Sequence, residues 1–599
     1  MTTGGGVRLV LLSITLSVAV AQRTVIETTT GKVRGKVLNL YGRQVVAFLG
    51  IPYAEPPIGP LRFKPPQPAK NWTSVFDAFQ YGNSCYQIKD TLFPNFTGSE
   101  AWNANTPLSE DCLKINVWMP NPPPADKTVM VWIYGGGFWY GTASLDYYDG
   151  KTIAAIENVV VVSMNYRVGS LGFLALGHQD APGNMGLMDQ NLALQWVQKN
   201  IAFFGGDPQK VTILGESAGS VSVGYHLLSL KSRNLFTRAI MQSGAPNCPW
   251  AFITNKEALR RGKAFARAVE CPTTVPLDQT IECLRSKPAE YIIAKEWVTS
   301  DPIFRFPHVP VIDGTFITED PKTSIRRGNF KRCNLLAGAV KDEGTFFLIY
   351  GAPGFSKQTE SLISRSQFLE GVKMSVPETN SFGVDAIAFQ YTNWLKENDG
   401  VSNRDALDDV VGDHNVICPL NDFAHAYASF GQSVYKYSFE QRASNLVWPK
   451  WMGTPHGYEI EFQFGLPLEP KRNYTRDEAN FSRRMMRNWA NFARTGNPNK
   501  ESFQTYSQEL WPRYTVSGRQ FITLDINPPK LGQGPRIDEC ALWSEYLPKL
   551  TRQTSDISEA ERLWKEEFKL WTKQYMEDWK AQYKDYVTYR DQGCPRPSN

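Results

Sequence analysis

The stretch Gly215-Glu216-Ser217-Ala218-Gly219 has residue types and a spacing that suit acyl-transfer chemistry. In a G-x-S-x-G sequence between a strand and a helix, the glycines allow a strained turn that raises the serine hydroxyl above the sheet. Ser217 is therefore the candidate nucleophile for attack on a carbonyl carbon. Glu216 poses a question, because it places a carboxylate beside a group that must develop negative charge.

A second glycine-rich stretch, residues 134–138, has the sequence YGGGF and also follows an apolar run. Consecutive glycines can turn backbone N–H groups toward an anion, so those of Gly136 and Gly137, with the N–H of Ala218, could form an oxyanion hole. Each motif alone could be a structural turn. Their occurrence together favours a hydrolase.

A neutral serine hydroxyl needs a base. In an α/β-hydrolase the catalytic residues follow the order serine, acid, histidine along the chain, so the base lies late in the sequence. His456, in a loop after a Trp-rich segment, is the preferred base, and His414 is the alternative. For the acid, Glu343 lies just beyond an apolar run, but Asp342 and Asp413 fit the spacing equally well.

Several apolar runs indicate the elements that must position these side chains. Residues 128–136, 159–167 and 210–219 are rich in β-branched and aromatic residues, as in strands buried on both faces. Apolar residues three and four apart predict a helix over 188–201, and 334–340 is a later strand. Alternating strands and helices predict a large, mostly parallel, doubly wound α/β sheet covered by helices.

The composition is that of a globular protein, with 42% hydrophobic and 21% charged residues. The net charge of +5 is spread over 599 residues without a long Lys/Arg run, so we expect no nucleic-acid partner. Residues 1–21 combine one charge, an apolar run and a small-residue cleavage pattern, which predicts a secretory signal peptide. A membrane anchor is the alternative, but the run is shorter than the ~20 residues that a spanning helix needs.

Secretion makes the nine cysteines candidates for disulfides, and an odd number leaves at least one thiol free or paired between chains. Cys594, near the C-terminus, is the candidate for a link between subunits. The spacing of Cys271 and Cys283 suggests that they close a small loop. Four N-glycosylation sequons fit the same route, at Asn71, Asn95, Asn473 and Asn480.

No linker-like stretch occurs before about residue 550, so we expect one catalytic domain over residues 22–550. The composition then changes, and residues 556–599 form a tail whose apolar side chains recur mainly every three, four or seven positions. This spacing predicts an amphipathic helix with an aromatic face. The helix could dock on its own domain, but an aromatic stripe that ends near a lone cysteine better suits an oligomer seam. The aromatic face comprises Leu563, Trp564, Phe568, Trp571, Tyr575, Trp579, Tyr583 and Tyr586.

Seven motifs together identify a family resemblance. They are YGGGF, GNMGLMDQNLALQWVQKNIAFFGGDP, GESAGS, KDEGTFFLIYGAPGF, GDHNVICP, SNLVWPKWMG and HGYEIEFQFG. The chain closely resembles the cholinesterase branch of the carboxylesterase family from about residue 24 to its end. The resemblance implies an α/β-hydrolase fold, a triad of Ser217, Glu343 and His456, and no cofactor or metal.

The resemblance also implies a pattern of cysteines and an assembly. It pairs Cys85 with Cys112, Cys271 with Cys283 and Cys418 with Cys540, and it leaves Cys248 and Cys333 as thiols. The tail is similar to a Trp-rich tetramerisation peptide that wraps a proline-rich anchoring subunit and links chains through a cysteine such as Cys594. Trp571 and Trp579 are eight residues apart rather than the family's seven, which weakens the tetramer expectation; a dimer is the other homo-oligomer expected.

For the substrate, the resemblance implies acetylcholine. Trp102 matches the tryptophan that holds the quaternary ammonium group, which cannot donate a hydrogen bond and is bound by cation–π attraction of ~0.5–2 kcal/mol. Phe346, Tyr350 and Trp448 match other aromatic positions of the choline site. Glu216 would add Coulombic attraction for a cation, or would only brace the turn; both interpretations stay open.

Phe304 and Phe306 match the two phenylalanines that narrow the acyl pocket, which Trp250 completes. An extra methylene against such a wall costs ~1–3 kcal/mol, so acetyl esters should be preferred to butyryl esters.

The rim of the expected site departs from the family pattern. Asp90 and Trp297 resemble the peripheral cation site, but Ile88 and Trp139 stand where the family's acetyl-selective members usually have tyrosines.

The sequence therefore predicts a secreted serine esterase that cleaves acetylcholine and terminates cholinergic signalling, held at a synapse or cell surface by an anchoring partner. A broader enzyme of the butyrylcholinesterase type is the alternative. A non-catalytic, neuroligin-like adhesion protein is a remote one, because such proteins lack parts of the triad.

Overall fold

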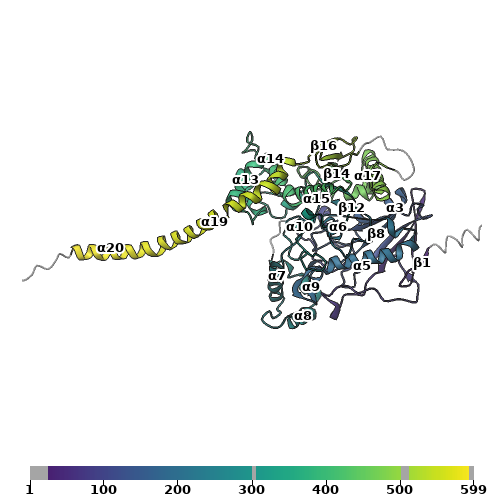
Figure 1. Ribbon diagram of the computed structural model, residues 1–599, viewed down its shortest axis with the longest axis horizontal. Coiled ribbons are helices and arrows are strands. Elements are labelled where there is room, and N and C mark those ends of the chain that lie inside the picture. Colours follow the sequence, from purple (N-terminus) through teal and green to yellow (C-terminus); the bar gives the residue numbers. More distant parts are fainter. Residues whose placement is uncertain (1–23, 300–304, 501–510, 592–599) are drawn as a thin grey trace, which may run out of the picture.

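The computed structural model describes residues 24–299, 305–500 and 511–591 (Figure 1). Within them, eleven strands form one sheet in the order β16-β15-β14-β13-β12-β11-β7-β8-β6-β4-β3. The strands from β8 through β7 and β11 to β15 run parallel, and antiparallel strands complete both edges. This architecture confirms the predicted α/β-hydrolase fold.

The strands of this sheet have the following bounds: β3 (Lys36–Leu40), β4 (Arg43–Pro52), β6 (Lys114–Asn121), β7 (Val129–Ile133), β8 (Val160–Met164), β11 (Val211–Glu216), β12 (Arg238–Gln242), β13 (Asn334–Val340), β14 (Val434–Phe439), β15 (Gln520–Leu524) and β16 (Leu531–Gln533). Two small sheets contain β1 (Val25–Glu27), β2 (Lys32–Arg34) and β5 (Phe76–Asp77), and β9 (Ala175–His178) with β10 (Ala181–Pro182).

The longer helices of the catalytic domain are α3 (Lys151–Glu157), α5 (Met185–Asn200), α6 (Ala218–Leu228), α7 (Asn255–Ala268), α8 (Leu277–Ser286), α10 (Pro321–Arg327), α12 (Arg365–Ser375), α13 (Ser381–Tyr391), α14 (Gly400–Gly412), α15 (Cys418–Ser429) and α17 (Arg476–Thr495). Short helices include α2 (Thr97–Glu100), α4 (Gly169–Phe173), α9 (Ala289–Ile293), α11 (Thr345–Leu348), α16 (Ile460–Gln463) and α18 (Ile537–Ala541).

The central strands are buried because helices pack on the sheet. Every residue of β7, β8 and β11 is buried, as their continuous apolar sequences predict. The helix α3 packs against β4, β6 and β8 and also contacts α17. The helices α6 and α15 pack against the strands from β11 to β14 and are both contacted by α10. The packed helices therefore hold the strands of the sheet in place. In α/β sheets the ligand site lies at the carboxyl ends of the strands.

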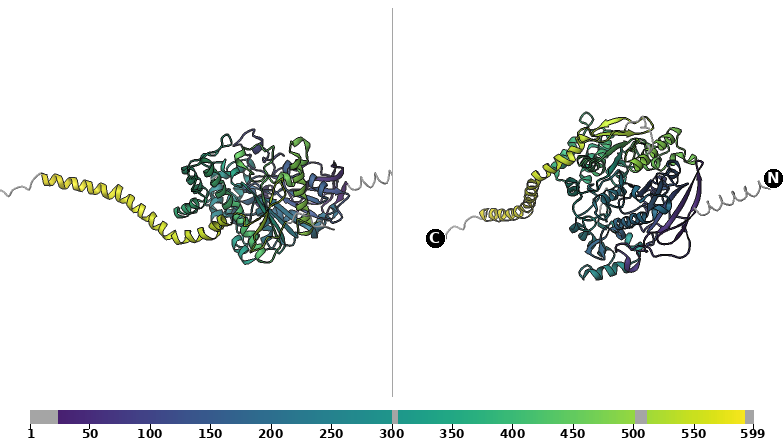
Figure 2. Two further views of the ribbon diagram at one scale, coloured as in Figure 1. Left: turned by 90° about the horizontal axis from the view of Figure 1, so that it is seen from above. Right: turned by 45° about the vertical axis from the view of Figure 1, so that its right-hand side comes forward.

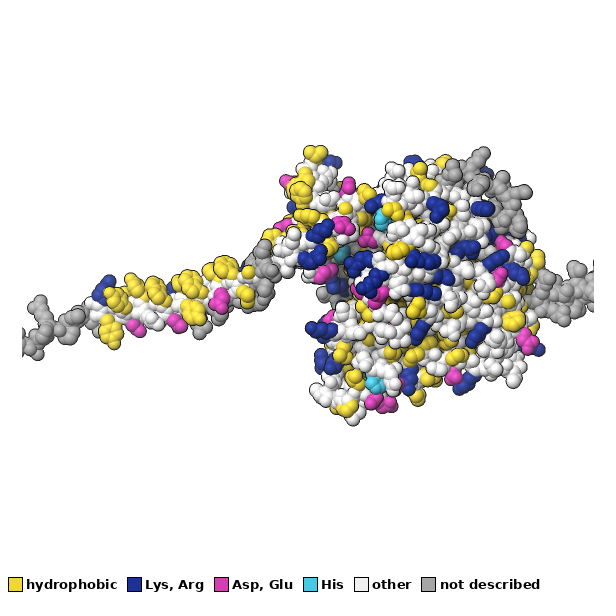
Figure 3. Space-filling model, in the orientation of Figure 1, with side chains coloured by type: hydrophobic (Ala, Val, Ile, Leu, Met, Phe, Trp, Pro, Cys, Tyr) yellow, Lys and Arg dark blue, Asp and Glu magenta, His cyan; other side chains and the backbone are white. Residues whose placement is uncertain are grey.

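The C-terminal segment leaves the catalytic domain as an arm (Figures 1 and 2). The helix α19 (Leu547–Leu570) contacts α13 and continues through a π-helical turn (Trp571–Tyr575) into α20 (Met576–Asp591). The first part of α19 packs on the catalytic domain, where Leu547 and Thr554 are buried, and the arm extends from there. Its aromatic face is exposed along its length, with Trp564 61% and Trp579 57% accessible, as the yellow side chains of Figure 3 show. A helix docked on its own domain would not leave these rings exposed.

None of the helices in the described part of the chain is both long and apolar enough to span a membrane. The predicted signal peptide and Cys594 lie outside the described residues. All four sequon asparagines, Asn71, Asn95, Asn473 and Asn480, are exposed to solvent.

Candidate functional site

Ser217 occupies a strained turn between β11 and α6. Its φ of 57° and ψ of −125° are rare for a residue with a side chain, and the neighbouring packing enforces them. A Cβ atom on Gly215 would lie 2.6 Å from the carbonyl carbon of Gly219, and one on Gly219 would lie 2.0 Å from the carbonyl oxygen of Ile133. The turn therefore fits only with glycine on both sides of the serine.

The YGGGF loop follows β7 and lies against this turn. A Cβ atom on Gly135 would approach the Ser217 Cβ atom to 2.9 Å. Gly136 and Gly137 have φ values of 107° and 56°, in the region that favours glycine. Ala218 is the first residue of α6, so its N–H belongs to the helix end that attracts negative charge. The structure thus brings the three proposed oxyanion-hole residues close to Ser217.

His456 and Glu343 form a buried hydrogen-bonded pair. The Nδ1 atom of His456 lies 2.5 Å from Oε2 of Glu343, across 113 residues of sequence. The other Glu343 oxygen accepts a hydrogen bond from the backbone N–H of Val340 at 3.0 Å, which fixes the carboxylate at the end of β13. The ring of Phe347 lies 5.1 Å from the imidazole ring. This pair can orient the imidazole and stabilise its positive charge.

The alternatives that the sequence left open lie elsewhere. His414 faces Glu378 at 3.7 Å and packs on Trp543. Asp413 forms an ion pair with Arg536 at 2.6 Å. Asp342 accepts a hydrogen bond from the backbone N–H of Thr454 at 2.7 Å and so supports the loop that carries His456.

Glu216 points at the free side of the imidazole. Its Oε1 atom lies 3.1 Å from Nε2 of His456, and within the described residues Nε2 has no hydrogen-bond partner. Catalytic hydrogen bonds to a serine often tighten only when substrate is bound. Although burial alone would lower the pKa of His456, the carboxylates of Glu216 and Glu343 raise it to about 9. Burial raises the pKa of Glu216 well above its usual value, and His456 opposes that shift.

These groups open on one cavity of about 500 Å³. Ser217 and His456 lie on its wall, and ten aromatic side chains also line it. Such a cavity is concave and largely apolar with a few convergent polar groups, as in small-molecule sites. The predicted residues that line it are Asp90, Trp102, Gly136, Gly137, Trp139, Glu216, Ser217, Trp250, Trp297, Phe306, Phe346, Tyr350 and His456.

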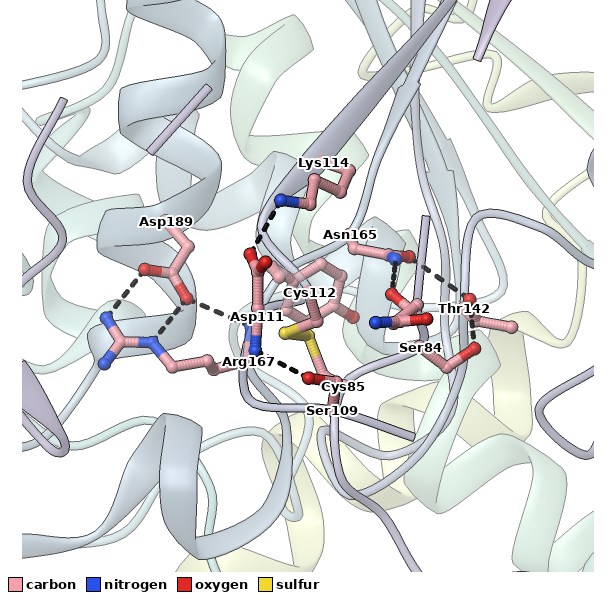
Figure 4. Close-up of a disulfide and its surroundings, with 12 residues drawn as sticks. Ser84, Cys85, Ser109, Asp111, Cys112, Lys114, Thr142, Asn165, Arg167 and Asp189 are labelled. Atoms are coloured by element: carbon pink, nitrogen blue, oxygen red, sulfur yellow. Dashed lines mark hydrogen bonds and ion pairs between the residues drawn. A yellow bond between two sulfur atoms is a disulfide. The ribbon is translucent and has the colours of Figure 1, made fainter. Parts of the chain in front are cut away.

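Trp102 and Asp90 line the cavity and belong to the loop between Cys85 and Cys112. Figure 4 shows the disulfide that closes this loop. Hydrogen bonds fasten the base of this loop to the domain. Ser84 donates to Thr142 at 2.9 Å, and Thr142 donates to Asn165 at 3.2 Å. The structure also contains the Cys271–Cys283 and Cys418–Cys540 disulfides and buried thiols at Cys248 and Cys333.

The indole of Trp102 is held by other aromatic side chains. Tyr147 stacks on it with ring centroids 4.8 Å apart. The Nε1–H of Trp102 donates a hydrogen bond to the Tyr458 hydroxyl at 3.4 Å. Trp448 donates to the same hydroxyl at 2.5 Å and packs behind Phe346, so it supports the cavity wall rather than lining it.

The expected acyl pocket is described in part, because Phe304 lies outside the described residues. The ring of Phe306 meets that of Trp250 edge to face, with centroids 5.6 Å apart. A Cβ atom on Gly137 would lie 2.8 Å from the Phe306 ring, so the ring borders the glycine loop. The Nε1–H of Trp250 donates to the carbonyl of Asn415 at 2.9 Å, which fixes the indole.

Aromatic residues and one carboxylate lie at the expected rim. Asp90 accepts a hydrogen bond from the Tyr350 hydroxyl at 2.6 Å. Trp139 and Trp297 meet edge to face at 5.2 Å, and Ile88 also lines the cavity. The two residues that depart from the family pattern thus face the same space as the residues that match it.

Sequence reasoning missed several residues of the site. Tyr140 and Tyr148 line the cavity, and Tyr147 and Tyr458 hold Trp102. Glu459 is fully buried. Burial of Glu216 is the main cause of its raised pKa, and the nearby carboxylate of Glu459 raises that pKa further. In the sequence, the dense aromatic content of 134–148 signalled Tyr140, Tyr147 and Tyr148, and no local pattern signalled Tyr458.

Comparison with known proteins extends over nearly the whole chain. A model of the Carboxylesterase family matches residues 22–543, and a model of the Acetylcholinesterase tetramerisation domain matches residues 558–594. The chain is 53% identical to an acetylcholinesterase of Bungarus fasciatus over 564 residues, which covers 94% of this chain and 92% of that protein. It is 52% identical to acetylcholinesterases of Danio rerio and Electrophorus electricus over 598 and 596 residues, with 94% of both chains covered in each case.

Proposed function

The chain belongs to the carboxylesterase family, and from this premise we propose that it hydrolyses acetylcholine to choline and acetate through an acyl-enzyme. The observation that carries the proposal is that His456, the strained Ser217 and the ring of Trp102 all face one cavity, while the buried Glu343 carboxylate holds His456 from behind. Relatives at 52–53% identity that are acetylcholinesterases support the same substrate.

In the proposed reaction, His456 accepts the Ser217 hydroxyl proton as the oxygen attacks the acetyl carbonyl carbon. The oxyanion that forms accepts hydrogen bonds from the N–H groups of Gly136, Gly137 and Ala218. His456 then donates its proton to the choline oxygen, choline leaves, and the acetyl group stays on the serine. Water, deprotonated by the same imidazole, releases acetate and restores the serine.

The cation of the substrate would lie against Trp102. A quaternary ammonium cannot donate a hydrogen bond, so an aromatic face with a nearby carboxylate is the surface that suits it. Glu216 is in position to supply that carboxylate, because a Cβ atom on Gly457 would meet both its Oε1 atom, at 3.6 Å, and the Trp102 ring, at 3.3 Å. Phe306 and Trp250 would limit the acyl group and favour acetyl over butyryl esters.

Substitution of the nucleophile tests the proposal. We expect Ser217→Ala to lose acetylthiocholine hydrolysis by several orders of magnitude while the folded protein is retained, because no other described group can form the acyl-enzyme at this site. Circular dichroism checks the fold. Undiminished hydrolysis would refute the assignment, and comparable wild-type turnover of acetyl- and butyryl-thiocholine would favour the broader enzyme instead.

The tail and the compartment complete the proposal. The match to a tetramerisation domain indicates that the chain forms oligomers. We infer that the exposed aromatic face of α19 and α20 surrounds a proline-rich anchoring subunit, that Cys594 links chains, and that removal of residues 1–21 accompanies secretion to a synapse or cell surface. The four exposed sequon asparagines support that route.

A further inference from the structure

Six cations gather where α6, α10 and α15 end, beside the amino-terminal ends of β12 and β13, whereas Ser217 follows the carboxyl end of β11. Four are exposed and two are half-buried. We call this group the cationic corner; it comprises Lys231, Arg233, Arg326, Arg327, Lys331 and Arg332. In Figure 3, dark-blue side chains are spread over the side of the domain that carries α10 and α15, and few magenta ones lie among them.

Contacts within the corner hold the cations close together. Arg233 donates to the backbone carbonyl of Asn329 at 2.8 Å, and the Lys331 ammonium donates to the carbonyl of Arg233. The Arg332 guanidinium lies 4.7 Å above the rings of both Phe330 and Phe430. The aromatic rings and backbone carbonyls therefore fix the side chains of Arg233, Lys331 and Arg332 without neutralising them.

Carboxylates compensate little of this charge. Arg327 pairs with Glu319 at 3.1 Å, and among the described residues the other five have no carboxylate within ion-pair distance. Burial lowers the pKa of Arg233 and the neighbouring Arg332 lowers it further. Burial also lowers the pKa of Lys331, and Arg233 adds to that effect.

Helix capping explains part of the cluster. Arg233 donates to the carbonyl of Leu228 at the end of α6, and Arg332 donates to that of Gly328 after α10. Each helix C-terminus carries about −0.5 of an elementary charge, so the three helix ends together offset about 1.5 of the positive charges. With Glu319, roughly +3.5 of the six positive charges remains uncompensated. An external polyanion is the partner that would neutralise this remainder.

We propose that the cationic corner binds a sulfated glycosaminoglycan chain. Guanidinium groups match oxyanions in a bidentate way, and ammonium groups supply point charges between them. Arg238 begins β12 and Arg519 directly precedes β15, so both add positive charge at the amino-terminal ends of these parallel strands, where neighbouring strands lie ~4.8 Å apart. A row of cations at successive strand ends suits an extended glycan chain with repeated sulfate groups. The choice of a glycan over a membrane rests on the proposed secretion, because anionic lipids concentrate in the cytoplasmic leaflet.

Heparin affinity chromatography of the full chain tests the proposal. The test variant combines Lys231→Ala, Arg326→Ala and Arg332→Ala. The control combines Lys36→Ala, Lys70→Ala and Lys396→Ala, three exposed lysines elsewhere, so that both lose the same net charge. We expect the control to elute with the wild type, the test variant to elute at lower NaCl, and its Kd for a heparin oligosaccharide to weaken roughly tenfold.

Esterase activity and oligomer size should be equal in all three proteins, so a failure of glycan binding would be separable from a failure of the proposed catalysis. Elution of both variants at the same salt would overturn the proposal, since binding would then follow net charge alone. Equal retention on desulfated heparin would also overturn it. Binding to phosphatidylserine vesicles without binding to heparin would assign the corner to a membrane instead.

Discussion

Glu216 lies 3.1 Å from Nε2 of His456, so the carboxylate beside the nucleophile can act on the base in addition to the attraction of a cation proposed above. A negative charge at this position stabilises the protonated imidazole. Burial has the largest effect on the pKa of His456 and lowers it. The next largest effect is that of the Glu216 carboxylate, which raises this pKa. The carboxylate therefore raises the pKa of the base, and attraction of the substrate's cation is the further effect proposed for it.

Glu216→Gln separates these two effects. We expect kcat/KM for acetylthiocholine to fall roughly tenfold, equivalent to about 1.4 kcal/mol, and to fall less for a neutral isosteric ester. The base works when it is deprotonated, so activity is lost as the pH falls through the pKa of His456. Removal of the Glu216 charge lowers that pKa, and the acid limb of the kcat/KM profile should move to lower pH. Equal losses on both esters with an unmoved limb would assign Glu216 to bracing the turn.

Phe306 gives a second prediction for a single side chain. Because its ring borders Gly137 and meets Trp250, Phe306→Val would open space beside the acyl carbon. The discrimination against butyryl-thiocholine should fall by ~1–3 kcal/mol, measured as the ratio of the two kcat/KM values. Phe355→Val is a matched control, since that ring packs on Trp451 and does not line the cavity. An unchanged ratio in Phe306→Val would place the acyl wall elsewhere.

At the scale of elements, two of the disulfides close loops of very different length. Cys418–Cys540 joins the start of α15 to α18 across 122 residues, whereas Cys271–Cys283 spans 12. Loop-closure entropy in the unfolded chain predicts a loss of ~5 kcal/mol for the long loop and ~3 kcal/mol for the short one. Paired Cys→Ser substitutions and denaturant unfolding would measure both. A larger loss from the short loop would contradict this entropic account.

The elements also show what could be predicted from sequence. The strands β7, β8 and β11 were predictable because each is a short run buried on both faces, and Gly215 and Gly219 marked the turn because no other residue fits there. The path of the 85–112 loop and the positions of the rings that pack on Trp102 could not be predicted from the sequence. Their positions depend on contacts such as Trp102 with Tyr458, 356 residues apart, for which no local pattern exists.

At the scale of the whole molecule, the catalytic domain and the arm present opposite surfaces. The domain buries its aromatic residues around the cavity, while the arm exposes a continuous aromatic face to solvent. Exposed apolar surface of this extent is unfavourable in an isolated chain, so the arm needs a partner. The match to a tetramerisation domain indicates that other chains are part of that partner.

Loss of this face should dissociate the oligomer and leave catalysis intact. In a variant with Trp564→Ala, Trp571→Ala and Trp579→Ala, we expect sedimentation velocity to show smaller species, with kcat/KM per active site unchanged because the arm lies outside the cavity. Glu577→Ala with Lys584→Ala is the control, since at ~3.6 residues per turn both lie on the opposite face of α20. An oligomer that survives loss of the three indoles would have to form through the catalytic domains. A parallel loss of activity would mean that the arm and the site are coupled.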